Sequence, residues 1–189
     1  MPRAAERTAT RTEVPSLLLN TMLVIAASAF VALAARFALP LPGTPVPLSL
    51  VNLAVLLVGM SMGAKRGFAA LALYLAEGAA GLPVFSPTGP GGIAQLLGPT
   101  GGYLIAYPLV AGLAGWAFHA AKKSDFKRAL LAATAGELLL FAAGVTWLLV
   151  LFHVPIAQAA AWGLYPFLAA EVVKVVAAAG IATRWRTSR

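Results

Sequence analysis

Four ionisable side chains stand inside apolar stretches of this sequence: Glu77, Glu137, Glu171 and Lys174. A charged group in such surroundings is costly unless it is paired or functional. Glu171 and Lys174 are three residues apart, so they share one face of a helix. Lys174 is therefore either half of a structural ion pair with a glutamate or a cation on a cavity wall that binds an anionic group. Since three carboxylates accompany this ammonium, at least one of them is expected to be protonated, to face water or to accept hydrogen bonds from a ligand.

The residue types give little support for metal binding, nucleotide binding or catalysis. The chain contains no cysteine, and its two histidines, His119 and His153, are expected near opposite ends of their helices. A metal centre is therefore not expected. The segment Gly98-Pro-Thr-Gly-Gly102 resembles a phosphate cradle but lacks the Lys-Ser/Thr ending of a nucleotide-binding loop. We expect a binding protein with no catalytic residues and no cofactor, and not an enzyme.

The composition determines the class of protein. Of the 189 residues, 60% are hydrophobic and 11% are charged, against roughly 25% charged residues in soluble domains. The apolar blocks are long enough to cross a bilayer, which takes about 20 helical residues. We expect one all-α integral membrane domain over residues 1–189. A polar cytoplasmic tail at 1–14 precedes six transmembrane helices, at about 16–39, 48–62, 68–80, 102–121, 129–151 and 167–183.

The basic residues predict the orientation. If the N-terminus is cytoplasmic and six spans follow, both termini are cytoplasmic and twelve of the fourteen basic residues face the cytoplasm. These are Arg3, Arg7, Arg11, Lys65, Arg66, Lys122, Lys123, Lys127, Arg128, Arg184, Arg186 and Arg189. Arg36 remains near the outer face and Lys174 within a helix. This is the positive-inside pattern, so the net charge of +8 indicates topology and not nucleic-acid binding.

One irregular stretch, residues 81–103, interrupts the helical pattern with seven glycines and four prolines. Proline and glycine disfavour helix, and irregular backbone at membrane depth is tolerated only inside protein or beside a water-filled cavity. With the Pro-rich turn 40–47 and the broken segment 152–166, it lies on the outer side. We expect a substrate cavity under these outer loops, with Phe85 and Tyr103 flanking the stretch as binding residues.

The first helix carries small residues on one surface: Ala27, Ser28, Ala32 and Ala35. Small residues let helices approach closely. The surface is either packed internally against a neighbouring span or a contact face for a separate membrane subunit.

Several segments together resemble one family. They are Pro-Val-Pro-Leu-Ser-Leu (45–50), Leu-Ala-Val-Leu-Leu-Val-Gly (53–59), Tyr-Leu-Ala-Glu-Gly-Ala-Ala-Gly-Leu-Pro-Val-Phe (74–85), Gly-Pro-Thr-Gly-Gly-Tyr-Leu (98–104) and Pro-Phe-Leu-Ala-Ala-Glu-Val-Val-Lys (166–174). This order resembles BioY, the biotin-binding S component of energy-coupling-factor (ECF) transporters. The resemblance implies six helices with biotin under the outer loops.

It also implies roles for particular residues. Lys174 matches the family's lysine, and Glu171 stands where the family has an aspartate. Gln95 lies shortly before the motif Gly98-Pro-Thr-Gly-Gly-Tyr103, and Thr100 is part of it. Ser49 and Asn52 complete the predicted substrate-binding set. The implied partners, in a bacterial plasma (inner) membrane, are a transmembrane coupling subunit and two ATPases. The resemblance also implies that the coupling subunit docks on the small residues of the first helix, so it favours the partner surface for Ser28 and Ala32. An S component for another small vitamin, or a structural membrane protein, remains the alternative.

Overall fold

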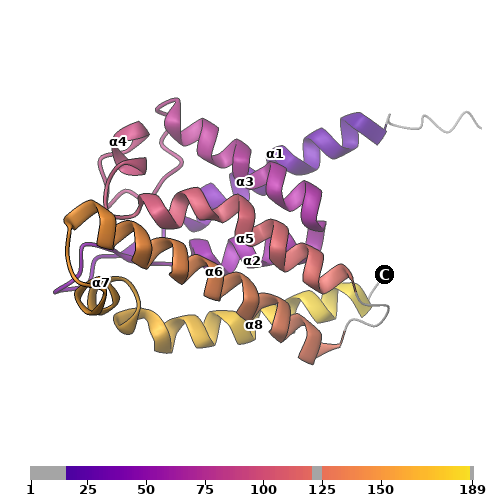
Figure 1. Cartoon of the computed structure of the whole chain (residues 1–189). Helices are drawn as coiled ribbons and strands as arrows, with labels where there is room; N and C mark the ends of the chain where they lie inside the picture. Colours follow the sequence, from indigo (N-terminus) through magenta and orange to yellow (C-terminus); the bar gives the residue numbers. More distant parts are fainter. Residues whose placement is uncertain (1–15, 121–124, 188–189) are drawn as a thin grey trace, which may run out of the picture.

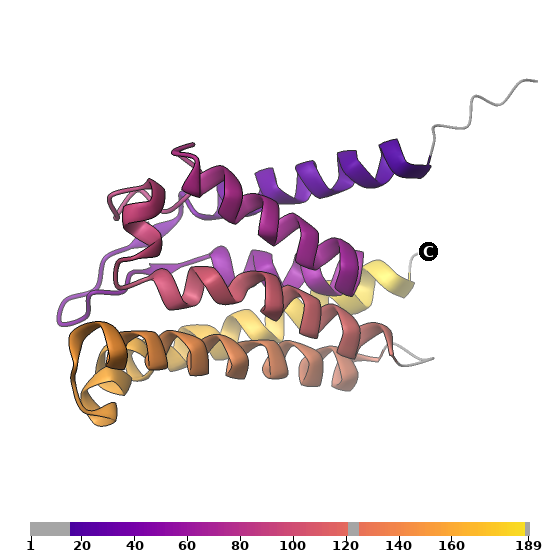
Figure 2. The same ribbon diagram turned by 45° about the horizontal axis from the view of Figure 1, so that its top comes forward.

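The computed structural model describes residues 16–120 and 125–187, and this part is mostly helical. Six longer helices run side by side, as Figures 1 and 2 show. They are α1 (Ser16–Ala34), α2 (Val51–Met62), α3 (Ala64–Ala79), α5 (Gly101–His119), α6 (Phe126–Phe152) and α8 (Leu168–Thr187). The shorter elements are β1 (Ala38–Leu39), β2 (Leu48–Ser49), α4 (Gly92–Leu96), α7 (Ile156–Gly163) and a 3-10 turn, η1 (Tyr165–Phe167).

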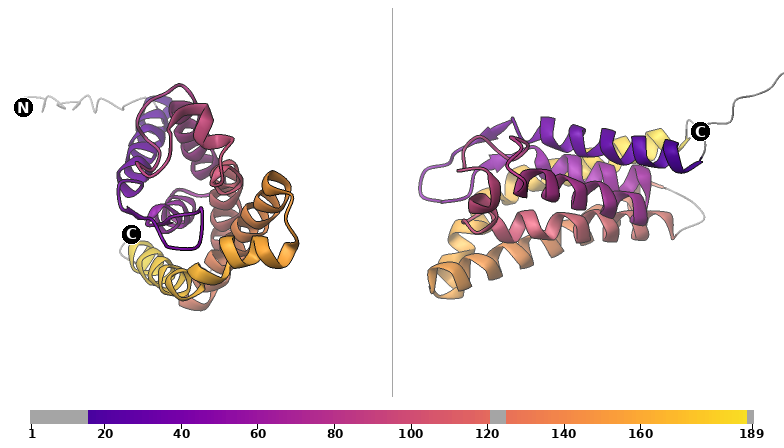
Figure 3. Two further views of the ribbon diagram at one scale, coloured as in Figure 1. Left: turned by 90° about the vertical axis from the view of Figure 1, so that its left-hand side faces the viewer. Right: turned by 90° about the horizontal axis from the view of Figure 1, so that it is seen from above.

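The shorter elements gather at one end of the bundle, which we call the loop end (residues 35–50, 80–100 and 153–167). The β1–β2 hairpin, α4 and α7 lie there together, whereas the α2–α3 turn and the C-terminus of α8 lie at the opposite end (Figures 1 and 3). The chain therefore brings the three irregular segments to one end, as the sequence predicts.

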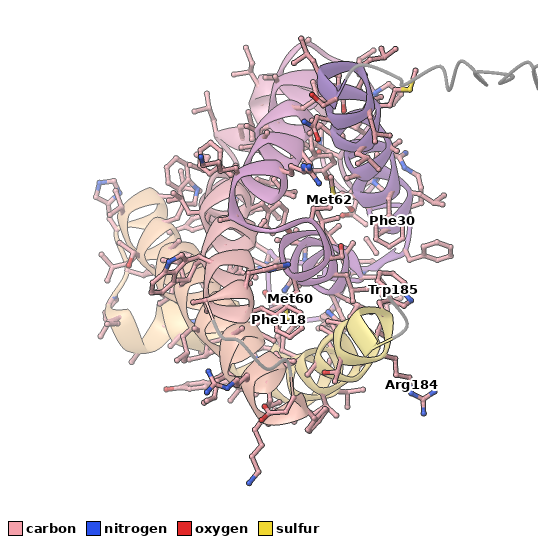
Figure 4. All side chains as sticks on the ribbon, turned by 90° about the vertical axis from the view of Figure 1, so that its right-hand side faces the viewer. Phe30, Met60, Met62, Phe118, Arg184 and Trp185 are labelled. Carbon is pink, nitrogen blue, oxygen red and sulfur yellow. The ribbon has the colours of Figure 1, made fainter. Side chains whose placement is uncertain are left out.

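The opposite end, which we call the closed end, is filled by apolar side chains. Met60 and Phe118 are 1% exposed, and Figure 4 shows both within the ring of helices while Arg184 points away from it. The described basic side chains Lys65, Arg66, Lys127 and Arg128 are also exposed here. The predicted tail and Arg3, Arg7, Arg11, Lys122, Lys123 and Arg189 lie outside the described residues, as does the side chain of Arg186.

Within the described part of the chain, four helical stretches are long and apolar enough to cross a membrane: Ser16–Ala34, Gly101–His119, Phe126–Phe152 and Ile156–Trp185. The last of these joins α7, η1 and α8. Helix α2 is apolar but has 12 residues, and α3 has 16. The helices therefore support an integral membrane protein.

Several predicted helix bounds differ from the structure. The first helix ends at Ala34 and not at residue 39, because Ala38 and Leu39 pair with Ser49 and Leu48 in an antiparallel hairpin around the Pro-rich turn. Because of the same pairing, α2 begins at Val51 and not at residue 48. Helix α3 begins at Ala64, directly after Gly63, so the basic segment expected as a turn is helical. Apolar content alone misses such starts, since polar residues also occupy first turns.

Helix α5 lies at the centre of the bundle and packs against α2, α3 and α6. Glycines make these approaches possible. A Cβ on Gly115 would overlap the Gly59 carbonyl oxygen and the backbone at Gly63 and Ala64, whereas a Cβ on Gly112 would meet Phe68 at an ordinary 3.8 Å. Close α2–α5 packing therefore depends on Gly115.

We predict that Gly115→Ala lowers the stability of the purified protein by about 1–3 kcal/mol, because the new methyl group forces two backbones apart. Gly112→Ala, in the same helix, is the matched control and should be neutral or slightly stabilising. Melting temperature in detergent measures both. Equal melting temperatures for the two variants would contradict the packing described here.

Candidate functional site

A small cavity of about 50 Å³ lies inside the loop end of the bundle. It receives side chains from the hairpin, from α2 to α6, from η1 and from α8. The lining residues are Val46, Pro47, Ser49, Val51, Asn52, Tyr74, Ser86, Gln95, Thr100, Tyr103, Leu104, Tyr107, Phe141, Phe167 and Glu171. Six of the eight side chains predicted to bind substrate are therefore brought together: Ser49, Asn52, Gln95, Thr100, Tyr103 and Glu171.

The two predicted residues that do not line the cavity are Lys174 and Phe85. Lys174 lies one layer behind the wall: its Nζ donates to Glu171 Oε1 at 2.7 Å and to the Ser49 carbonyl oxygen at 2.5 Å. Lys174 is 6% exposed and Glu171 3%. The ion pair between them is thus present in this state, and both partners of the ammonium face the cavity.

Lys174 also borders a second, more open hollow of about 580 Å³ on the flank of the bundle, between the hairpin and α8. Ser49 lines both this hollow and the cavity. The ammonium is therefore held at the boundary between the two spaces.

A second carboxylate lies next to this pair. Glu137, on α6, is 6% exposed, and its charge interacts with both Glu171 and Lys174. The Asn52 carboxamide, on α2, lies beside both carboxylates. In the described part of the chain, neither Glu137 oxygen nor Glu171 Oε2 makes a hydrogen bond of good geometry, and the Asn52 carboxamide is a donor placed to interact with both carboxylates. The cluster therefore offers buried acceptors whose hydrogen bonding within the protein is incomplete.

Three tyrosines complete the polar lining, and only Tyr103 was predicted. The Tyr103 hydroxyl donates to the Gly163 carbonyl oxygen at 2.6 Å, and the Tyr107 hydroxyl donates to Asn52 Oδ1 at 3.4 Å. Tyr74, on α3, has a buried hydroxyl with no hydrogen-bond partner among the described residues. Tyr107 follows Tyr103 by one helical turn, a spacing that could have indicated a shared face.

The irregular stretch, residues 81–103, forms one wall of this cavity, and three residues hold it in place. Gln95 is 3% exposed; its Oε1 accepts from the Gly91 amide at 3.1 Å and its Nε2 donates to the Ser86 carbonyl oxygen at 3.4 Å. Trp147 Nε1 donates to the Gly98 carbonyl oxygen at 2.9 Å.

The third anchor comes from Arg36, which the charge pattern indicated only as an outer-side residue. Its guanidinium donates to the carbonyl oxygens of Pro83 and, at 2.7 Å, of Phe85. The Phe85 ring packs edge-on against Tyr74, with ring centroids 5.3 Å apart. Phe85 therefore supports the cavity wall from behind.

The small-residue surface of α1 requires a correction. Ala27, Ser28 and Ala35 are 7%, 0% and 0% exposed, and Ser28 Oγ donates to Glu77 Oε2 on α3 at 2.5 Å. These three side chains are buried inside the bundle, where the Ser28 hydroxyl satisfies a Glu77 carboxylate oxygen, so they present no surface to another subunit. Ala32 is half-buried.

One motif that could be read as catalytic has another explanation. Gly59-Met-Ser-Met-Gly63 has the Gly-x-Ser-x-Gly spacing of a hydrolase nucleophile, which requires a strand-to-helix turn. Ser61 instead lies in the last turn of α2 at the closed end, and its Oγ donates to the Leu57 carbonyl oxygen at 2.6 Å. The Ser61 hydroxyl is therefore used in a hydrogen bond to the backbone of its own helix.

Comparison with known proteins agrees with this architecture. The family model of the BioY family matches residues 6–189. Biotin transporter BioY2 of Lactococcus lactis subsp. cremoris is 35% identical over 159 residues, covering 84% of this chain and 85% of that protein. Biotin transporter BioY of Thermotoga maritima is 40% identical over 144 residues, covering 76% and 83%. The solved S-component for biotin from an ECF-type ABC transporter superposes with a TM-score of 0.83 at 25% identity, covering 90% of this chain and 92% of that one. The chain therefore belongs to the BioY family.

Proposed function

We propose that this protein is the biotin-binding subunit, or S component, of an ATP-driven ECF uptake transporter. The observation that carries the proposal is the buried Lys174–Glu171 pair at the wall of a polar and aromatic cavity. It occurs in a chain whose family membership extends over nearly its whole length.

The chemistry of the cavity suits biotin. The fused rings of the vitamin are mostly apolar, and Tyr103, Tyr107 and Phe167 offer aromatic walls for them. The ureido group presents two N–H donors and a carbonyl acceptor, which Glu171, Gln95 and Thr100 can meet. The valerate carboxylate favours a cation, and Lys174 is the nearest lysine within the described helices.

Binding requires the cavity to widen. Its volume of about 50 Å³ is well below the roughly 300–1,000 Å³ of small-molecule sites. The cavity lies among the loops of the loop end, whereas Met60 and Phe118 fill the closed end. We therefore place the route of biotin at the loop end.

The topology follows from the same ends. We propose six spans, with α2 and α3 as the short ones, and both termini in the cytoplasm, since the described basic residues other than Arg36 and Lys174 lie at the closed end. The loop end then faces outward from a bacterial plasma membrane. We propose a transmembrane coupling subunit and two ATPases as its partners, because the sequence contains no nucleotide-binding motif of its own.

The direct test is equilibrium calorimetry of biotin with the detergent-purified protein alone. Saturable one-to-one binding that other vitamins do not compete away supports the proposal. Displacement of biotin by another vitamin at lower concentration would reassign the substrate, and a lack of saturable binding would reject the function.

We predict that Lys174→Ala weakens biotin binding by about 2–5 kcal/mol, because truncation leaves a buried carboxylate unpaired and removes the cation. Lys127→Ala, exposed at the closed end, is the control. The double variant Lys174→Ala/Glu171→Gln removes the unpaired charge. If that double variant binds as tightly as wild type in calorimetry, Lys174 serves only to neutralise Glu171, and its role in binding is rejected.

We further predict that Arg36→Ala weakens biotin binding by about 1–3 kcal/mol, because the guanidinium holds two carbonyl groups of the cavity wall in place. Arg66→Ala changes an exposed arginine at the closed end and should leave affinity unaltered. Dissociation rates measured by stopped-flow displacement should increase for Arg36→Ala. Unchanged rates would show that the wall does not need this anchor.

A further inference from the structure

Three tyrosines line the cavity, and their hydroxyl groups differ in one respect. Those of Tyr103 and Tyr107 donate to protein acceptors, the Gly163 carbonyl oxygen and Asn52 Oδ1. The Tyr74 hydroxyl is buried and donates to no acceptor in the described part of the chain. Tyr74 is 0% exposed, and its side chain borders the cavity.

A buried hydroxyl without a partner destabilises the folded protein, and replacing it by an apolar group of the same shape is nearly neutral or stabilising. The ring of Tyr74 is fixed by its neighbours: Phe85 packs edge-on at 5.3 Å and Tyr107 lies at 6.5 Å, centroid to centroid. Phe85 reaches this position because Gly78 has no side chain to block its ring. Phenylalanine at position 74 would keep this packing, so packing alone does not explain the hydroxyl.

The unused groups around the cavity match the hydrogen-bonding inventory of a cyclic urea. A ureido group has one carbonyl acceptor and two N–H donors. The cavity wall offers a donor with no partner in the described part of the chain, the Tyr74 hydroxyl, and an acceptor whose hydrogen bonding is incomplete, Glu171 Oε2. A carboxylate, by contrast, favours a cation, and the buried ammonium is Lys174, which lies behind the wall.

We propose that Tyr74 contacts the ligand directly, and that its hydroxyl donates a hydrogen bond to the ureido carbonyl oxygen of bound biotin. This inference rests on the proposed function and adds a specificity-determining residue to it. Ligands that carry a carboxylate but no ureido group lose this contact, so Tyr74 selects for the ring system and not for the acid.

The test is Tyr74→Phe. Tyr107→Phe, which removes a hydroxyl already bonded to Asn52, is the control for the melting temperature only, because Tyr107 also lines the cavity. We expect Tyr74→Phe to weaken biotin binding roughly 5- to 150-fold, as for a buried acceptor left unpaired. The melting temperature of the ligand-free variant should equal or exceed that of wild type, whereas Tyr107→Phe should lower it. Unchanged biotin affinity, or a lower melting temperature for Tyr74→Phe, would overturn the proposal.

A biotin analogue in which a methyl group replaces the carboxyl group, and which therefore has no acceptor at that end, identifies the ligand atom. The same fold-loss for this analogue and for biotin supports the ureido carbonyl as the acceptor. A loss seen with biotin and absent with the analogue would assign the hydroxyl to the carboxylate and overturn the proposal. Biotin binding by the wild-type protein distinguishes a failure of the proposed function from a failure of the role of Tyr74. If the wild-type protein does not bind biotin, the proposed function is rejected. If wild type and Tyr74→Phe both bind biotin tightly, only the role of Tyr74 is rejected.

Discussion

The loop end of this protein depends on the need to satisfy one buried ammonium. Lys174 lies inside an apolar helix bundle, where an unpaired charge would cost several kcal/mol. Its Nζ is satisfied by a carboxylate one helical turn away, Glu171, and by the Ser49 carbonyl oxygen of the hairpin. The second contact ties α8 to the segment that enters α2. A single cation thus joins the last helix to the outer hairpin and sets the position of two cavity-lining residues.

Around this pair the bundle holds more polar groups than its own hydrogen bonds use. Glu137, Glu171 and Tyr74 each retain a buried oxygen with no partner among the described residues, although burial without hydrogen bonding destabilises a fold. Glu171, on α8, and Tyr74, on α3, line the cavity, and Glu137, on α6, interacts with Glu171, while Met60 and Phe118 fill the interior of the closed end. Stability is thus reduced where a ligand can restore it, and this arrangement favours a binding protein over a structural one.

The sequence was informative at positions where the free-energy cost of a charged, proline or glycine residue leaves few structural explanations for it. The ionisable residues in apolar stretches left two alternatives for Lys174, an ion pair with a glutamate or a cation on a cavity wall, and the structure shows the pair with Glu171. The glycines and prolines predicted the irregular backbone of residues 81–103. The sequence was less informative about which neighbour a helix face packs against. The small face of α1 suits either a partner or the bundle, and only the contact between Ser28 and Glu77 decides for the bundle. The anchoring role of Arg36 depends on contacts with residues 47 and 49 positions away in the chain. The burial of the Tyr74 hydroxyl likewise depends on packing against other segments, which local periodicity does not encode.

The central claim is that biotin binds beside the buried ion pair at the loop end. A structure of the protein with biotin, solved by crystallography or by cryo-electron microscopy with a fiducial, tests this most directly. The account predicts biotin within the widened cavity, with a ligand atom in hydrogen-bonding distance of Glu171 or Lys174. Biotin bound on the flank between α6 and α7, or at the closed end, with the Lys174–Glu171 pair untouched, would contradict it.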